Sequence, residues 1–344
     1  MINIMLIILN IAEIALFLVC VLFTIAFLTV AERKTMAYMQ RRLGPNAVGW
    51  YGLLQAFADA VKLLIKEIVI PKEANAFIFL ISPIITLITA LLGWLVIPFG
   101  PSLTLGDLEN GILFSLAIGS LGVFGSLLAG WGSNSKYSFL GSVRSTAALI
   151  SYELVLTTVY IIIIMFGSSL NFTGLIETQR VVWYCIPLLP FVFLFFISTV
   201  AETNRPPFDL IEAENELVAG FFTEYSASPF VFFFLAEYGN VILMSAATTI
   251  LFFGGYLFPT FGFILPYNPS FLSALSEGLL YGFSFGIKLC FFMYLFIWVR
   301  ASFPRFTFDY LIKLCWTIFL PLLFGLFLFV PSILYLFNSL SLNI

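Results

Sequence analysis

The feature that most constrains this chain is a series of long apolar stretches that carry almost no charge. A helix of about 20 apolar residues is long enough to cross the hydrocarbon core of a bilayer. Eight stretches reach roughly this length, at 6–30, 76–98, 111–131, 145–166, 181–200, 229–252, 276–298 and 314–338. Because lipid offers no hydrogen bonds to the backbone, each stretch is expected to be helical. The sequence therefore predicts an all-α polytopic membrane protein with eight transmembrane helices, as one integral-membrane domain over residues 1–344.

Composition supports a lipid environment and excludes several kinds of site. Only 10% of the residues are charged, against about 25% in soluble domains. The net charge of −3 argues against nucleic acid as a partner. The chain has no histidine, and its four cysteines lie far apart in apolar segments without ligand spacing. We therefore expect no metal or iron–sulfur cluster to be held by this chain alone.

Lysine and arginine are distributed unevenly between the two sides of the predicted bundle. When the loops are counted alternately, 13 of the 15 basic residues fall on one side and only Arg180 on the other, with Lys288 inside a span. Such an excess is typical of loops that face the cytoplasm or the matrix. Both termini are therefore expected to face the opposite, outer side.

The first inner loop, 31–75, contains the segment GLLQAFADAVKLLIKEI at 52–68. At helical spacing, its leucine, isoleucine, valine and phenylalanine side chains share one face, and Gln55, Asp59, Lys62 and Lys66 share the other. This pattern predicts an amphipathic helix on the inner side. Either the helix lies on the lipid headgroups, or its apolar face is docked on the bundle and lines an opening for a lipid-like molecule.

A second inner loop, 201–228, contains a third of the acidic residues of the chain. It begins AETNRPPFDLIEAENELVAGFFTEYS, and its carboxylates are Glu202, Asp209, Glu212, Glu214, Glu216 and Glu224. The two prolines predict a turn over 201–208. A helix can restart near Asp209, where Asp209 and Glu212 resemble a capping box.

On a helical projection of this loop, Asp209, Glu212 and Glu216 form a polar side, whereas Glu214 falls on the apolar arc and Glu224 at its edge. The acids of the polar side are compatible with an ordinary solvated face. An acid on a buried face is harder to explain in this way, because burial of an unpaired carboxylate is costly. A row of carboxylates is instead a plausible proton path. We expect Glu214 and Glu224 to be far less exposed than Glu212 or Glu216.

Further charges fall within the predicted spans. Glu153 lies in the fourth span, near Arg144 at its start, Glu237 in the sixth and Lys288 in the seventh. Intramembrane charges are costly and usually pair or mark an ion path. Each could simply be a polar residue with a local partner, but together they suggest a polar path that reaches the acidic loop.

Five segments of the sequence carry a resemblance to a known family. They are AERKTMAYMQRRLGPNAVGWYGLLQAFADAVKLLIKE (31–67), GWGSNSKYSFLGSVRSTAALISYE (130–153), the acidic stretch quoted above, FFLAEYGN (233–240) and WVRASFPRFTFDYLIKLCW (298–316). The chain resembles, nearly from end to end, the membrane subunit of NADH–quinone oxidoreductase (respiratory complex I) that is known as subunit 1.

The resemblance implies a function for a multi-subunit enzyme, not for this chain alone. In this family the subunit joins the peripheral arm to the membrane arm, ubiquinone enters from the bilayer, and its reduction is linked to proton translocation. NADH, FMN and the iron–sulfur clusters belong to partner subunits. The inner loops 31–75 and 201–228 would then form the quinone-chamber region.

The resemblance also implies roles for particular residues. The quinone tunnel would be lined by Arg33, Arg42, Asp59, Phe234 and Arg300. The proton path and acidic loop would comprise Glu202, Arg205, Asp209, Glu212, Glu214, Glu216, Glu224, Arg144, Glu153, Glu237 and Lys288.

Two other functions compete with this interpretation. One is a stand-alone ion transporter, and the other is the homologous subunit of a membrane-bound hydrogenase, which need not use quinone. The abundance of phenylalanine, 42 of 344 residues, favours an organelle-encoded protein. We therefore expect a mitochondrial inner-membrane location, with both termini in the intermembrane space.

Overall fold

The computed structural model describes residues 2–101, 103–209, 218–258 and 271–336, and every regular element within these residues is helical. The all-α prediction is thus confirmed for the described residues. The α-helices are α1 (Ile2–Met39), α2 (Gln55–Ile65), α3 (Ala76–Leu92), α4 (Gly111–Ser133), α5 (Lys136–Gly167), α6 (Phe172–Thr178), α7 (Leu189–Glu202), α9 (Ala227–Phe252), α10 (Phe271–Ser302), α11 (Phe308–Leu314) and α12 (Leu320–Leu336). Four short segments complete the described elements: the 3₁₀ turns η1 (Trp50–Gly52), η2 (Gly93–Val96) and η3 (Gly220–Glu224), and the π-helical η4 (Cys315–Phe319).

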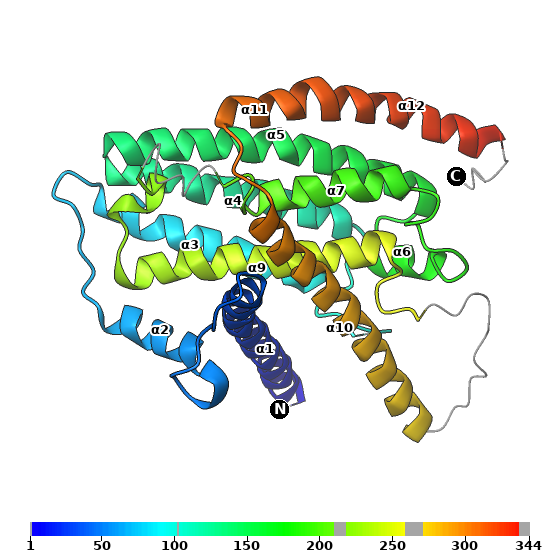
Figure 1. Ribbon diagram of the computed structural model, residues 1–344. Coiled ribbons are helices and arrows are strands. Elements are labelled where there is room, and N and C mark those ends of the chain that lie inside the picture. The colour runs from blue at the N-terminus through cyan, green and yellow to red at the C-terminus, as the bar shows by residue number, and fades with distance from the viewer. Residues whose placement is uncertain (1, 102, 210–217, 259–270, 337–344) are drawn as a thin grey trace.

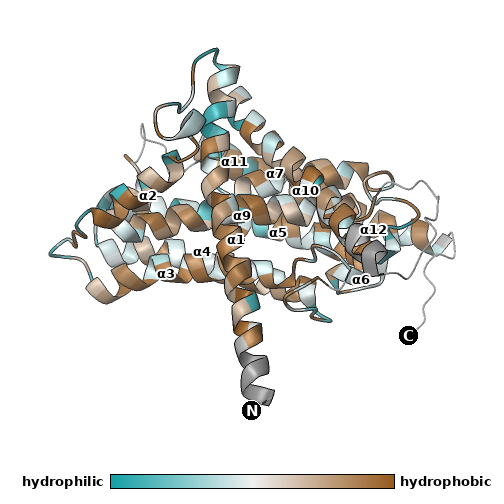
Figure 2. Cartoon of the chain, turned by 90° about the horizontal axis from the view of Figure 1, so that it is seen from below, coloured by the Kyte–Doolittle hydropathy of each residue, from teal (hydrophilic) through white to brown (hydrophobic). Residues whose placement is uncertain are grey.

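The helices form a bundle crossed by two steeply inclined members (Figure 1). Helices α3, α4, α5, α7 and α9 run side by side, and α12 lies along the outside of α5. Helices α1 and α10 both cross the bundle in contact with α9. Apolar residues dominate the long helices, and hydrophilic residues gather mainly in the loops and at helix ends (Figure 2). This distribution suits a bundle whose sides are surrounded by lipid.

Within the described residues, seven helical segments are long and apolar enough to cross a membrane: Ile11–Met39, Ala76–Val96, Gly111–Ser133, Lys136–Gly167, Ala227–Phe252, Gly278–Ser302 and Phe308–Tyr335. They correspond to seven of the eight predicted stretches. Several helices extend well past the apolar core, since α1 continues to Met39 and α5 begins at Lys136. Each residue added to an existing helix gains one backbone hydrogen bond without a new nucleation cost. Polar residues next to an apolar span can therefore continue the same helix.

The remaining predicted stretch, 181–200, is only partly helical. Residues 181–188 form bends and turns, and α7 spans just 14 residues. Two prolines account for this: Pro187 lacks the amide hydrogen that a helix interior requires, and Pro190 occupies the first turn of α7, where proline is tolerated. A helix of this length is about 21 Å long, against about 30 Å of hydrocarbon. The count of eight spans therefore stays a prediction.

Helix α2 falls within the segment predicted to be amphipathic, although it is shorter than 52–68. It contacts α1 and α9. Several of its apolar side chains are nevertheless exposed, with Val61 at 54% and Leu64 at 63%. Whether this helix lies at the inner membrane surface stays a prediction.

The end of the acidic loop is fixed by close packing. Gly220 of η3 lies so near Gly141 of α5 that a side chain at Gly141 would clash with the Gly220 backbone. The following Tyr225 stacks on Phe79 of α3, with ring centroids 4.1 Å apart, and its hydroxyl lies 2.9 Å from that of Ser82. Burial raises the pKa of Tyr225 to about 12. The loop therefore returns to the bundle at a rigid point before α9 begins.

Candidate functional site

A cavity of about 330 Å³ lies where α1, α9, α10 and the turn after α7 meet. We call it the ionic chamber, because six of its lining residues are charged. Its lining residues are Glu32, Arg33, Met36, Asn204, Arg205, Pro206, Asp209, Phe234, Glu237, Tyr238 and Arg300. Segments far apart in the sequence thus place acids and bases around one cavity.

The centre of the ionic chamber wall is a carboxylate that the sequence analysis missed. Glu32 on α1 is only 4% exposed. It accepts hydrogen bonds from Nη1 of Arg205 at 2.9 and 3.2 Å, and Nη1 of Arg300 also pairs with it. Little in the sequence indicates that Glu32 is buried, because it directly precedes Arg33 and Lys34 and resembles part of a charged loop. The continuation of α1 to Met39 instead carries it into the bundle.

Arg205 is the best-shielded base of this group, with a side chain 11% exposed. Burial lowers the pKa of Arg205, but its interactions with Glu32 and Tyr238 outweigh that effect, so its pKa lies above the usual range. The guanidinium therefore stays charged. A buried charge of this kind is tolerated only with partners at close range, and Glu32 provides one.

Asp209 forms a second ion pair at the chamber wall. Asp209 is 3% exposed, and its Oδ2 lies 3.3 Å from Nη2 of Arg305 in the segment after α10. The amide of Phe306 also donates to the carbonyl of Pro207 at 3.0 Å. The loop after α10 is therefore fastened to the proline turn. The predicted capping of a helix by Asp209 falls on residues 210–217, which lie outside the described residues.

A third ion pair links the chamber to α2. Nη1 of Arg33 lies 2.6 Å from Oδ2 of Asp59, and Gln55 donates to the other oxygen of Asp59 at 2.9 Å. Both members of the pair are substantially exposed. Such a pair contributes about 1 kcal/mol or less, so it orients α2 and adds little stability. Asp59 and Arg42 are not among the residues that line the chamber; the Arg42 side chain bonds to Gln40 at 2.7 Å.

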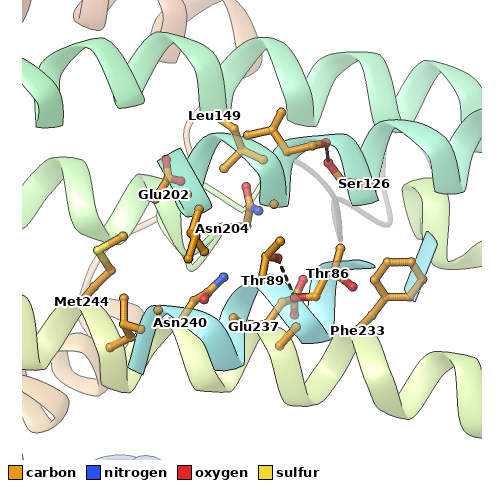
Figure 3. Close-up of a pocket in the computed structure, with 18 of the residues that line it drawn as sticks. Thr86, Thr89, Ser126, Leu149, Glu202, Asn204, Phe233, Glu237, Asn240 and Met244 are labelled. Atoms are coloured by element: carbon orange, nitrogen blue, oxygen red, sulfur yellow. Dashed lines mark hydrogen bonds between the residues drawn. The ribbon is translucent and has the colours of Figure 1, made fainter. Parts of the chain in front are cut away.

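A second cavity of about 110 Å³ lies between α3, α4 and α9, near the end of α7. We call it the polar cavity. Its polar lining residues are Thr86, Thr89, Ser115, Ser126, Glu202, Asn204, Glu237 and Asn240. Figure 3 shows Glu202 and Asn204 on one side of this space and Asn240 and Glu237 on the other. A cavity with this volume and this lining can hold several water molecules.

The two cavities have a common wall. Asn204 and Glu237 line both the ionic chamber and the polar cavity. Within the described part of the chain, Oε2 of Glu202 is buried without a hydrogen-bond partner. Glu153 of α5 interacts electrostatically with Glu202. Of the predicted path residues, Glu202 and Glu237 therefore line one cavity, and Glu153 lies near Glu202.

Other predicted path residues lie apart from these three. The guanidinium of Arg144 lies over the Phe308 ring, 5.6 Å from its centroid. Glu224 is half-buried at the end of η3, which is a 3₁₀ turn and not the α-helix predicted there. The backbone explains this correction, because Val218 and Gly220 both have positive φ, which an α-helix excludes. Glu212, Glu214 and Glu216 lie outside the described residues, so their relative exposure stays a prediction.

Lys288 of α10 has a distinct local environment. Its Nζ donates to the carbonyls of Phe253, Gly255 and Leu257 at 2.7, 2.8 and 2.6 Å, and it lies 4.5 Å from the ring centroid of Trp183. Three acceptors satisfy all three ammonium hydrogens. This lysine fastens the turn after α9 to α10.

Among the described residues, no group of three or more cysteine, aspartate or glutamate side chains has a geometry that could hold a metal ion. The chamber instead combines fixed charges with Phe234 and Tyr238, whose ring centroids are 4.5 Å apart. Such an arrangement can bind a molecule with polar carbonyl groups on a flat ring.

Comparison with known proteins supplies the family. The family model described as NADH dehydrogenase matches residues 12–331. NADH-ubiquinone oxidoreductase chain 1 of Yarrowia lipolytica is 70% identical over 335 residues, covering 96% of this chain and 98% of that protein. The proteins of the same name from Podospora anserina and Chondrus crispus are 54% and 48% identical, over 98% and 92% of this chain and 99% and 94% of their own length. The resemblance noted in the sequence is thus confirmed, and this chain belongs to the NADH dehydrogenase family of membrane subunits.

Proposed function

We propose that this chain is subunit 1 of a proton-translocating NADH:ubiquinone oxidoreductase, in which it forms the quinone tunnel and chamber. The observation that carries the proposal is the ionic chamber. Three predicted tunnel residues, Arg33, Phe234 and Arg300, line it together with Arg205 and Asp209 of the acidic loop. Ubiquinone is the substrate that the names of the relatives specify.

The chemistry of the chamber suits a quinone headgroup. A quinone presents two carbonyl oxygens on a flat ring, and the guanidinium groups of Arg205 and Arg300 are hydrogen-bond donors of matching type. Phe234 and Tyr238 offer aromatic surface to the ring. The isoprenoid tail needs an apolar route to lipid, and the exposed apolar side chains of α2 are placed beside α1 to provide one.

The polar cavity gives this chamber a connection toward the membrane interior. Reduction of a quinone to a quinol takes two electrons, delivered by partner subunits from NADH, and two protons. Chamber groups that give up those protons become more negative. Glu237 lines both cavities and can carry that change to Glu202 and Glu153. In this proposal Glu224 and the acids at 212, 214 and 216 complete the acidic loop, and Arg42 and Asp59 flank the tunnel entrance.

The proposal includes the setting of the subunit. It places the chain in the mitochondrial inner membrane with eight spans, α7 together with residues 181–188 making up the short one, and with both termini on the outer side. Other membrane-arm and peripheral-arm subunits surround it, and NADH, FMN and the iron–sulfur clusters belong to them. This chain carries no catalytic residue by itself.

Photoaffinity labelling of the assembled enzyme tests the proposal. A photoreactive ubiquinone analogue is expected to label residues 31–67 and 201–225, and excess unlabelled ubiquinone is expected to suppress the labelling. Labelling confined to other subunits, or unchanged by competing ubiquinone, would refute the assignment of the chamber. Ion movement by the isolated chain in liposomes would favour a stand-alone transporter instead.

A further inference from the structure

Tyr238 of α9 occupies a central place in the ionic chamber that its sequence does not reveal. It follows Glu237 and lies one helical turn after Phe234. It is only 7% exposed, yet it lines the chamber. Tyr238 therefore lies between the packed core of α9 and the charged groups that face the cavity.

The ring of Tyr238 supports the most buried base of the chamber. The guanidinium carbon of Arg205 lies 4.0 Å from the Tyr238 ring centroid. A cation stacked at this distance over an aromatic face is attracted by the negative potential of the ring, most strongly where water is excluded. The stacking also restricts Arg205 to one plane, and that plane determines where its five N–H groups point.

The Tyr238 side chain also lies beside the other half of the same ion pair, because Tyr238, Glu32 and Arg205 line one small cavity. Tyr238 interacts with the Glu32 side chain as well as with Arg205. Glu32 in turn is shared with Arg300. One tyrosine thus interacts with both members of the ion pair, and the positions of both arginines depend on that pair.

The geometry points to Tyr238 as a positioning residue for quinone binding, which holds Arg205 and Glu32 so that Arg205 and Arg300 direct their free N–H groups into the chamber. This inference rests on the proposed function. Glu32, Arg205 and Arg300 carry a net charge of +1, and an electron-rich quinone oxygen is best bound when that charge is fixed in direction. Preorganised donors bind more tightly than donors that must first be ordered.

The two parts of the tyrosine can be removed separately. Tyr238→Phe keeps the ring beneath Arg205 and removes the hydroxyl, whereas Tyr238→Leu removes both. Tyr256→Phe is the matched control, because the Tyr256 hydroxyl also bonds a glutamate, Glu177 at 3.1 Å, but Tyr256 lies in the turn after α9 and does not line the chamber. All three variants are to be tested in the assembled enzyme.

We would measure KM and kcat for a short-chain ubiquinone in each variant. The amount of enzyme is normalised by the rate at which NADH reduces a hydrophilic electron acceptor, a reaction that does not involve the quinone site. Tyr238→Phe is expected to raise KM about tenfold, as for the loss of one polar interaction with a charged group. Tyr238→Leu is expected to raise it about 100-fold. We expect kcat to change less than about threefold in either variant, and Tyr256→Phe to leave KM unchanged.

Several outcomes would overturn the inference. An unchanged KM in both Tyr238 variants refutes a positioning role. Loss of assembled enzyme with an unchanged KM for the remainder shows a purely structural role and also refutes it. An equal rise of KM in Tyr256→Phe shows that the effect is not specific to the chamber. Because wild-type labelling tests the chamber independently, failure of the Tyr238 inference is distinguishable from failure of the proposed function.

Discussion

Replacement of Glu32 by glutamine tests whether one buried carboxylate organises the ionic chamber. The change preserves shape and removes one negative charge that faces two guanidinium groups. Arg205 and Arg300 then both lose the carboxylate with which they pair. Their side chains are 11% and 28% exposed. Loss of one partner from a buried ion pair costs about 3–5 kcal/mol. The partial exposure of Arg300 places the expected loss near the lower end, about 3 kcal/mol.

Thermal inactivation of quinone reduction in membranes is a suitable assay, because large membrane complexes inactivate irreversibly and their stability is measured as a rate. A loss of about 3 kcal/mol accelerates inactivation by up to about 150-fold. Glu177→Gln is the control. It breaks the Arg180–Glu177 pair, whose side chains are 66% and 41% exposed, and an exposed pair contributes about 1 kcal/mol or less.

A double variant separates the ion pair from unrelated damage. If Glu32 and Arg205 act as a pair, Glu32→Gln combined with Arg205→Gln is expected to inactivate more slowly than the two single effects together predict, by at least about 1 kcal/mol of coupling. Additive effects within about 0.5 kcal/mol, or a Glu32→Gln enzyme as durable as the Glu177→Gln control, would refute the reasoning.

Three further predictions concern neighbouring groups. Lys288→Met leaves three backbone carbonyls without their hydrogen-bond donor, so thermal inactivation should be at least tenfold faster than in the wild-type enzyme. Inactivation at the wild-type rate would contradict the role of Lys288 in holding the turn after α9. Asn204 has a positive φ of 49°, which glycine adopts without strain and which costs valine about 1–2 kcal/mol. The Asn204→Gly enzyme should therefore be assembled at wild-type levels and the Asn204→Val enzyme at lower levels. Blue-native gels of membranes compare the two, and equal assembly would argue against backbone strain. Glu202→Gln should retain quinone reduction but lower the protons moved per NADH, measured with a pH indicator in vesicles; an unchanged ratio would remove Glu202 from the path.

Much of the fold follows from hydropathy, because each span satisfies its own backbone hydrogen bonds and needs no distant partner to be recognised. The stretch 181–200 shows the limit of this reasoning. Its composition is as apolar as that of its neighbours, but Pro187 and Pro190 restrict the helix to Leu189–Glu202. Counting apolar residues locates the segment, and only the position of the prolines indicates where its helix begins.

The site was less predictable, because its contacts join residues far apart in the chain. Glu32 pairs with Arg205 and Arg300, which are 173 and 268 positions away. No local pattern marks Glu32 as buried, since its neighbours Arg33 and Lys34 are typical of a loop. Asp209 is a second case. Its local spacing predicts a helix cap for residues that lie outside the described ones, and no local pattern indicates its ion pair with Arg305.

The balance of charges around the ionic chamber bears on how, in the proposed function, quinone reduction is coupled to proton translocation. The chamber is lined by three acids, Glu32, Asp209 and Glu237, and by three bases, Arg33, Arg205 and Arg300. When all six are ionised, their charges sum to zero. Uptake or release of one proton by any carboxylate then leaves a full unit of charge, which interacts strongly over a few ångströms in a medium of low polarity. Glu32 and Asp209 are each paired with an arginine, and Glu237 also lines the polar cavity that contains Glu202. A change in the charge of Glu237 therefore acts on both cavities at once, and in the proposed function this shared wall connects quinone chemistry to the carboxylates inside the bundle.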